Sequence, residues 1–155
     1  MEEINIREDF QIGEEASLKK KISQQDILKF AEITEDRNPI HLDEHYASRT
    51  FFKKRIVHGM LPASLISAVL GTKLPGSGSI YLDQYLKFLK PVYPGDEITA
   101  IVRVTDWNNE KRRIKLLTEV INQNQDVVII GEANLMMASN LKKETQDTNN
   151  LHTNS

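Results

Sequence analysis

The most apolar segment of this chain reads Met60-Leu61-Pro62-Ala63-Ser64-Leu65-Ile66-Ser67-Ala68-Val69-Leu70, and the rest of the architecture follows from it. Pro62 suits a first helical turn, and Gly71 suits a helix end. Apolar side chains would lie on nearly every side of this helix, so other elements must cover it. We therefore predict a buried helix from Met60 to Leu70.

Strand patterns flank this helix on both sides. Ala16, Leu18, Lys20 and Ile22 alternate with polar residues before it, which predicts a short, half-exposed strand. Further strands are predicted after it at residues 80–88, 98–104, 114–120 and 127–137, linked by Pro, Gly and Asn turns. Gly131 is a candidate bulge in the last one. Helices segregated from an antiparallel run indicate an α+β fold, in which one curled sheet wraps the apolar helix.

A second helix is predicted ahead of the apolar one. Ser23 and Asp26 form an acidic variant of the capping box, and an apolar face continues to about Ile33. Asn38-Pro39 ends this helical pattern, because proline disfavours helical geometry in the residue before it. Another short helix is expected at residues 43–48.

Length and composition narrow the class of protein. The 155 residues fit one domain, which we place at residues 1–139, and the polar residues 140–155 predict a disordered tail. Twenty basic against twenty-two acidic residues give a net charge of −2, which disfavours nucleic-acid binding. Cysteine is absent, which excludes disulfides, thiolate metal sites and a cysteine nucleophile. No leader or membrane-spanning pattern is seen, so we expect a soluble cytoplasmic protein.

The densest polar cluster is Asp36-Arg37-Asn38-Pro39-Ile40-His41. On a continuous helix, Asp36 and His41 would lie on different faces, but a break at Pro39 lets His41 fold back toward Asp36. A carboxylate and an imidazole that face one small volume can hold a water molecule and exchange its protons, and the Asn38 amide can orient that water. The alternative is an ordinary Asp/Asn turn with a surface histidine.

Ile56-Val57-His58-Gly59-Met60 leads into the apolar helix. The unpaired N–H groups of a helix N-terminus, together with a Gly59 that lacks a side chain, would stabilise an oxyanion; alternatively, the glycine serves loop geometry only. Ser67 either supports the carboxylate or bonds back to the Ala63 carbonyl. His58 receives no role.

Two further features have alternative interpretations. Lys53-Lys54-Arg55 either contacts phosphates of a cofactor such as coenzyme A or forms a solvated loop, which is the commoner case. His41 and His45 have the spacing of a helical metal pair, but we expect no metal, because cysteine is absent and Pro39 lies just before His41.

Together these motifs resemble the MaoC-like (R)-specific enoyl-CoA hydratases. The similarity extends from about Ile12 to Met137. The matching residues are Phe30-Ala31, Asp36 to Asp43, Ile56 to Met60, Ala63 to Leu65, Leu74 to Leu82 and Pro91 to Asp96. Relatives often carry proline before the Ile-Val-His-Gly run, and we expect Arg55 in that place to loosen the loop.

The resemblance implies a hot-dog fold, a curved antiparallel sheet around one long helix, and a homodimer with a continuous sheet. It implies that Asp36 and His41 are the acid/base pair of a hydro-lyase, that Asn38 positions water, and that the Gly59 N–H forms the oxyanion hole. Ser67 inherits a supporting role. Coenzyme A is then part of the substrate, and no separate cofactor is expected. The expected reaction is hydration of trans-2-enoyl-CoA to (R)-3-hydroxyacyl-CoA.

Two other functions remain open at this point. A 3-hydroxyacyl-[acyl-carrier-protein] dehydratase would use the same fold and the same catalytic groups. A non-catalytic acyl-CoA-binding module would use the fold alone, since fold does not determine function. Rates with the two kinds of thioester would separate the first, and tight binding without turnover would identify the second.

Overall fold

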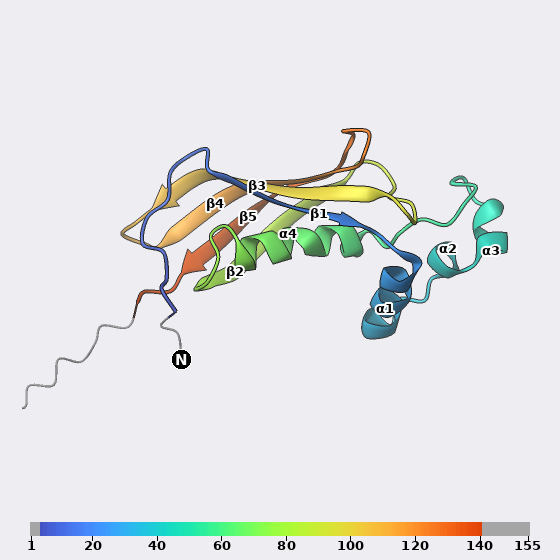
Figure 1. Ribbon diagram of the computed structural model, residues 1–155, viewed down its shortest axis with the longest axis horizontal. Helices are drawn as coiled ribbons and strands as arrows, with labels where there is room; N and C mark the ends of the chain where they lie inside the picture. The colour runs from blue at the N-terminus through green and yellow to red at the C-terminus, as the bar shows by residue number, and fades with distance from the viewer. Residues whose placement is uncertain (1–3, 141–155) are drawn as a thin grey trace, which may run out of the picture.

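The computed structural model describes residues 4–140, and its central element is the predicted apolar helix (Figure 1). This helix, α4, spans Met60–Thr72 and continues two residues past the predicted end, so Gly71 lies inside it. Three short helices precede it: α1 (Gln24–Thr34), α2 (Pro39–Leu42) and α3 (Glu44–Ser48). The five strands are β1 (Glu15–Lys21), β2 (Ser79–Phe88), β3 (Glu97–Asn108), β4 (Arg113–Ile121) and β5 (Val127–Met137).

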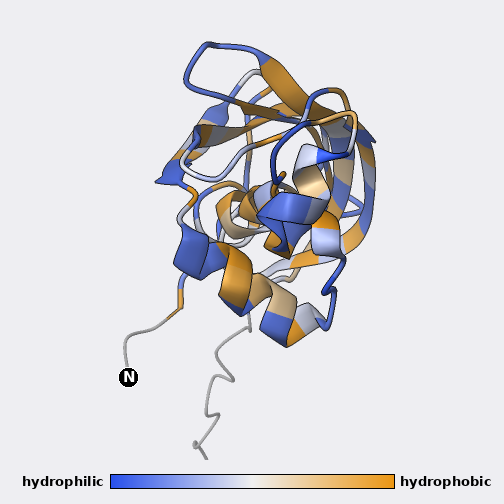
Figure 2. Ribbon diagram, turned by 90° about the vertical axis from the view of Figure 1, so that its right-hand side faces the viewer, coloured by the Kyte–Doolittle hydropathy of each residue, from blue (hydrophilic) through white to orange (hydrophobic). Residues whose placement is uncertain are grey.

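All five strands form one antiparallel sheet in the order β1-β3-β4-β5-β2. The sheet lies along α4 and curves around it, as the end view in Figure 2 shows. The predicted α+β class and the hot-dog arrangement are therefore confirmed. Tight hairpins link β3 to β4 and β4 to β5, as the Asn-rich turns predict.

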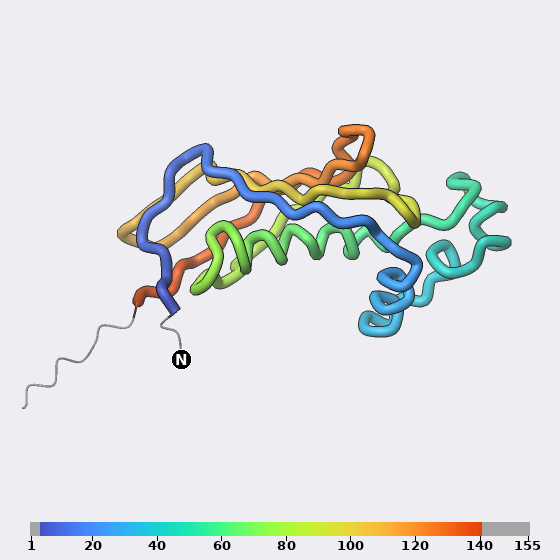
Figure 3. Tube along the Cα trace, in the orientation of Figure 1, coloured from blue at the N-terminus to red at the C-terminus, as the bar shows by residue number. Residues whose placement is uncertain are grey.

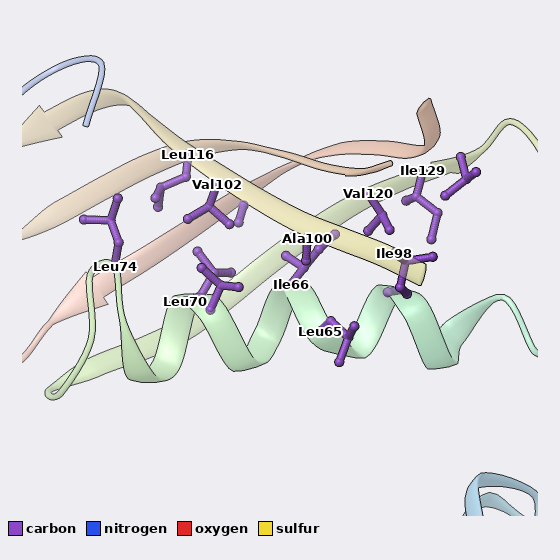
Figure 4. Packing of buried hydrophobic residues seen from close by; sticks show 14 of the residues in the cluster. Leu65, Ile66, Leu70, Leu74, Ile98, Ala100, Val102, Leu116, Val120 and Ile129 are labelled. Atoms are coloured by element: carbon purple, nitrogen blue, oxygen red, sulfur yellow. The ribbon is translucent and has the colours of Figure 1, made fainter. Parts of the chain in front are cut away.

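The core lies between α4 and the concave face of the sheet (Figure 4). Ile66 and Leu70 of the helix are fully buried against Ala100 and Val102 of β3 and Leu116 of β4. Truncating a buried aliphatic side chain such as Ile66 to alanine costs about 2–5 kcal/mol of stability. Contacts between these two layers therefore hold the N-terminus of α4 in place relative to the sheet.

One stripe of α4 is exposed, which corrects the prediction that the helix is covered on all sides. Met60, Ser64, Ser67 and Gly71 follow each other at intervals of three and four residues and face away from the sheet. The stripe was not recognised in the sequence because most of its residues are small. The sheet of a single chain therefore covers only part of the helix surface.

Gly131 is not a bulge, contrary to the prediction. It pairs regularly with Leu86 of β2 and Thr118 of β4. A Cβ atom at this position would lie only 1.9 Å from the Tyr85 carbonyl oxygen, so the glycine permits the close approach of β2 to β5. The register shifts occur elsewhere in the sheet, one of them at Leu82, between Tyr81 and Asp83.

The segment from α1 to α3 projects beyond the N-terminal end of α4 (Figure 3). Its first helix begins with the predicted capping box, in which Ser23 Oγ accepts a hydrogen bond from the Asp26 N–H and Asp26 accepts one from the Ser23 N–H. The short helix predicted at residues 43–48 is confirmed as α3, which Asp43 caps. This overhanging segment carries the polar cluster that the sequence singled out.

The two ends of the described chain meet at one place. The Asn140 side chain accepts a hydrogen bond from the Ile6 N–H at 3.0 Å and donates one to the Ile6 carbonyl at 2.9 Å. Asn140 is the first residue of the predicted tail, and here it is part of the domain. The rest of that predicted tail, residues 141–155, lies outside the described residues.

Candidate active site

The chain breaks after α1 in a way that folds His41 back toward Asp36. Glu35 ends α1 in the left-handed conformation, with φ of 63°. The Asp36 carboxylate then accepts a hydrogen bond from the Asn38 N–H, and the Asn38 side chain caps α2 by accepting one from the Ile40 N–H. The sequence predicted a loop here, whereas residues 39–42 form one helical turn.

The His41 ring is buried, with 8% of its surface exposed, so it is not the surface histidine of the alternative interpretation. Its Nδ1 lies 2.8 Å from the Ile56 carbonyl oxygen, which can only accept a hydrogen bond. Nδ1 therefore carries the ring proton, and Nε2 keeps a free lone pair. Burial lowers the pKa of His41 below 6.5, although the hydrogen bond to Ile56 and the Asp36 charge oppose this shift. The neutral ring with its Nε2 lone pair free is therefore favoured.

A second histidine, His58, completes the cluster. A carboxylate oxygen of Asp36 and one ring nitrogen each of His41 and His58 lie within 4.8 Å of one another. Two hydrogen bonds of about 2.8 Å that meet at a tetrahedral angle span about 4.6 Å. The carboxylate and the His41 ring are therefore close enough to share one water molecule.

The same three residues have a composition that could bind a metal ion. The His41 and His58 rings, however, are stacked, with centroids 3.9 Å apart and planes inclined by only 28°. Ring-nitrogen lone pairs lie in the ring plane, so stacked rings direct them along neighbouring planes and not onto one point. This geometry favours proton transfer over metal coordination. His45, the other candidate ligand, is exposed on α3.

A pocket of about 330 Å³ opens beside this cluster at the N-terminus of α4. Its polar lining includes His41 and Gly59. Its walls are mostly apolar and come from the loop between α3 and α4, from α4, from the end of β2 with the loop after it, and from β5: Phe52, Ile56, Val57, Pro62, Phe88, Leu89, Lys90, Pro91, Val92 and Ile129. A small polar end on an apolar cavity suits a ligand with one reactive polar group on a hydrocarbon chain.

Gly59 has ordinary helical dihedrals, with φ of −56° and ψ of −38°. Loop geometry therefore does not require glycine here, which argues against the alternative interpretation of this residue. A Cβ atom would lie 3.0 Å from the Phe88 ring and would narrow the pocket. Within residues 4–140, no protein group accepts a hydrogen bond from the Gly59 N–H. An unpaired donor at a helix N-terminus thus lines the pocket.

The two remaining predicted site residues lie farther out. Asn38 is exposed, and because its oxygen caps α2, its NH₂ group is left to donate. Ser67 is exposed on α4 about 12 Å along the helix from Gly59. Among the hydrogen bonds of residues 4–140, none joins Ser67 to the Ala63 carbonyl, and Ser67 does not line the pocket. The roles given to Asn38 and Ser67 remain predictions.

Arg55 was expected to loosen the loop before α4, but in the structure its hydrogen bonds restrain that loop. Its guanidinium donates to Glu44 at 2.9 Å and to Gln24 at 2.8 Å, and it reaches the His41 carbonyl at 3.5 Å. Arg55 thereby ties α1, α2 and α3 together, and its guanidinium is not available as a phosphate ligand.

Lys54 of the same basic run lines a second, more polar pocket of about 410 Å³. The two pockets adjoin, because Lys90 and Pro91 line both. Lys54 Nζ lies 4.1 Å above the Tyr93 ring, while Lys90 pairs with Asp126 at 3.3 Å. A polar compartment with two lysines and two aspartates therefore lies next to the apolar one.

His58 and Phe88 are the site residues that sequence reasoning missed. Phe88 was only the last residue of a predicted strand, and His58 was left without a role although it precedes Gly59 directly. Adjacency to Gly59 was the available signal for His58. No sequence signal places Phe88 beside Gly59, because a turn, a helix and a strand separate them.

Comparisons with known proteins identify relatives over most of this chain. The model of the MaoC-like domain family matches residues 9–126. An (R)-specific enoyl-CoA hydratase of Rhodospirillum rubrum is 51% identical over 130 residues, covering 84% of this chain and 90% of that protein. A 3-hydroxybutyryl-CoA dehydratase of Methylorubrum extorquens is 48% identical over 140 residues, covering 90% of this chain and 87% of that protein.

A solved structure shows the same fold. The (R)-hydratase of A. caviae involved in PHA biosynthesis superposes with a TM-score of 0.81 at 42% identity, covering 85% of this chain and all of that one. Among residues 4–140, no helix has the length and apolar character needed to cross a membrane. The matched family model, the level of identity and the shared fold show that this chain belongs to the family of MaoC-like domain proteins.

Proposed function

We propose that this protein is an (R)-specific enoyl-CoA hydratase, a hydro-lyase that adds water across the double bond of trans-2-enoyl-CoA to give (R)-3-hydroxyacyl-CoA. One observation carries the proposal: the buried His41, whose Nδ1 is bound to the Ile56 carbonyl, has a ring nitrogen within 4.8 Å of the Asp36 carboxylate and lines an apolar pocket. The names of similar proteins, which are enoyl-CoA hydratases and a hydroxyacyl-CoA dehydratase, support the same reaction.

The proposed mechanism uses one water molecule between Asp36 and His41. The pair removes a proton from this water while its oxygen bonds to the β-carbon of the enoyl group. The electron pair of the double bond moves toward the thioester carbonyl and forms an enolate. Proton transfer to the α-carbon restores the thioester, so the net change is the addition of one water molecule.

The Gly59 N–H would stabilise the enolate. The donor has no protein partner among the described residues and belongs to the N-terminus of α4, where helix N–H groups carry partial positive charge. Donors of this kind contribute about 2.7–4 kcal/mol when charge develops in the transition state. The thioester oxygen would bind there, with the acyl chain against the apolar pocket walls.

The second pocket supports coenzyme A as the thioester carrier. It adjoins the first pocket at Lys90 and Pro91, and the Lys54 ammonium in its lining could meet a phosphate group beyond the pantetheine arm. Ammonium groups favour phosphate oxygens through charge-assisted hydrogen bonds. The phosphopantetheine arm of an acyl-carrier protein also carries a phosphate, so the preference for a coenzyme A substrate rests on the names of the similar proteins.

We also propose a homodimer that pairs the β2 edges of two chains. β2 is an edge strand whose exposed side chains are largely apolar, including Tyr81, Leu82 and Tyr85. Exposed edges with apolar side chains are normally covered in a native protein. A dimer would also cover the exposed stripe of α4. A location in the cytoplasm stays a prediction.

The decisive experiment incubates purified protein with crotonyl-CoA and follows the loss of the enoyl absorbance. Chiral analysis of the product should show the (R)-3-hydroxy thioester. Release of free coenzyme A thiol without loss of the enoyl group would indicate a thioesterase instead. Tight binding without turnover would indicate a non-catalytic acyl-CoA-binding module.

A further inference from the structure

His58 is the most deeply buried polar ring in the described part of the site, with 2% of its surface exposed. Its Nε2 lies 2.9 Å from the backbone carbonyl oxygen of Asp36, which can only accept a hydrogen bond. Nε2 therefore carries the ring proton and donates a hydrogen bond to that oxygen. One face of the ring stacks on His41, and Phe30 of α1 lies 5.1 Å away by ring centroids. His58 therefore contacts both members of the predicted acid/base pair.

The other ring nitrogen of His58 destabilises the folded state. Nδ1 is buried, and within residues 4–140 no group forms a hydrogen bond with it. A buried polar atom without a partner costs about 1–3 kcal/mol. An apolar ring of similar size, such as phenylalanine, would fill the same space without this cost. Stability alone therefore does not explain a histidine at this position.

We propose that His58 is a positioning residue that holds Asp36 and His41 in their reactive arrangement. This inference rests on the proposed function, because it concerns the same pair of groups. Nε2–H fastens the backbone of Asp36, which otherwise belongs to an exposed loop. The ring face restrains rotation of His41, whose Nδ1–H is already bound to Ile56. With both restraints in place, the His41 Nε2 lone pair stays within reach of the water that Asp36 binds.

The arrangement links two segments that are far apart in sequence. Asp36 lies in the overhanging segment, whereas His58 lies directly before Gly59 and α4, which is anchored on the sheet. His58 thus transmits the position of the core helix to the loop that carries the carboxylate. A misplacement of about 1 Å in such a pair can lower the rate about 100-fold.

Two substitutions separate the contacts of His58. His58→Phe keeps a flat ring against His41 but removes the donor to Asp36. His58→Gln keeps an amide N–H at the reach of Nε2 but removes the stacked ring. We expect His58→Phe to lower kcat about 10–100-fold with a KM within about threefold of wild type. His58→Gln should recover part of this loss, because the donor to Asp36 is kept.

His45→Phe is the matched control, since His45 is an exposed histidine of the same region. It should keep the wild-type kcat. A merely structural role of His58 would lower the melting temperature of both His58 variants and leave kcat per folded molecule unchanged. A wild-type kcat in whichever His58 variant folds would overturn the proposal.

A readout without substrate separates this proposal from the proposed reaction. Nitrogen NMR of the histidine rings in the free protein should show His41 protonated on Nδ1 and His58 protonated on Nε2. In His58→Gln, which removes the stacked ring, the His41 signals should shift toward mixed tautomers as the His41 ring gains freedom. If wild type does not hydrate crotonyl-CoA but these shifts occur, the reaction is wrong and the positioning role stands. Unchanged His41 signals in His58→Gln would contradict the positioning role whatever the reaction.

Discussion

Replacement of Asp36 by asparagine tests the proposed chemistry with little disturbance of the structure. The Asp36 side chain is exposed, and its one hydrogen bond is accepted from the Asn38 N–H, which an asparagine oxygen can also accept. The change therefore removes the negative charge and basicity but keeps the turn. Loss of an acid/base group lowers kcat by about 10²–10⁴-fold, which corresponds to about 3–5 kcal/mol of transition-state stabilisation.

The stability of Asp36→Asn should hardly change. Exposed substitutions usually alter unfolding free energy by less than about 0.5 kcal/mol, or about 1–2 °C in melting temperature for a domain of this size. The assay follows loss of crotonyl-CoA absorbance, and thermal denaturation is measured on the same sample.

Asp43→Asn is the matched control for this variant. Asp43 is another exposed carboxylate of the overhanging segment, and it caps α3 by accepting a hydrogen bond from the Tyr46 N–H. Asparagine also caps helices well, so both activity and stability should stay near wild type. A folded Asp36→Asn protein that turns over within tenfold of wild type would refute the role of the carboxylate.

Three further predictions address the pH profile, the second pocket and the sheet. Because burial lowers the pKa of His41, the neutral base form of the ring predominates above pH 6.5. The kcat/KM for hydration should therefore be constant above pH 6.5 and fall only at lower pH. A midpoint above pH 6.5 for this fall in kcat/KM would contradict the assignment of His41 as the base. Lys54→Glu should raise the KM for crotonyl-CoA several-fold. It should leave the KM for crotonyl-N-acetylcysteamine unchanged, because that thioester has no phosphate. An equal change in KM for both substrates would exclude a contact between Lys54 and a phosphate. Gly131→Ala should destabilise the fold by about 3 kcal/mol in thermal denaturation, because the new Cβ atom would collide with the Tyr85 carbonyl oxygen. Gly71→Ala is the control: position 71 has open space around it inside α4, so this change should be neutral or stabilising.

Much of the fold could be predicted because its signals are local. The capping box at Ser23 and Asp26, the alternation along the strands and the apolar run after Met60 each depend on residues within a few positions of one another. The break at Pro39 was also readable, and with it the return of His41 toward Asp36. The order of the motifs along the chain predicted the family as well.

Other features depended on partners that are distant in sequence. The bond of His41 to Ile56 spans 15 residues, and the bond of His58 to Asp36 spans 22. Arg55 was expected to loosen its loop because its ligands on α1 and α3 were not visible in the local pattern. Gly131 was interpreted as a bulge because the sequence does not show how closely the neighbouring strand approaches.

By itself, the amino-acid sequence determined the elements, their order and the identity of the acid/base candidates, because helix caps, side-chain periodicity and proline act over short range. Only the tertiary structure decided which nitrogen of His41 is free, what holds that ring and the Asp36 loop in place, and which stripe of α4 stays exposed. These properties arise where segments from different parts of the chain meet, so the packing of α4 against the sheet and the overhanging segment had to be known first.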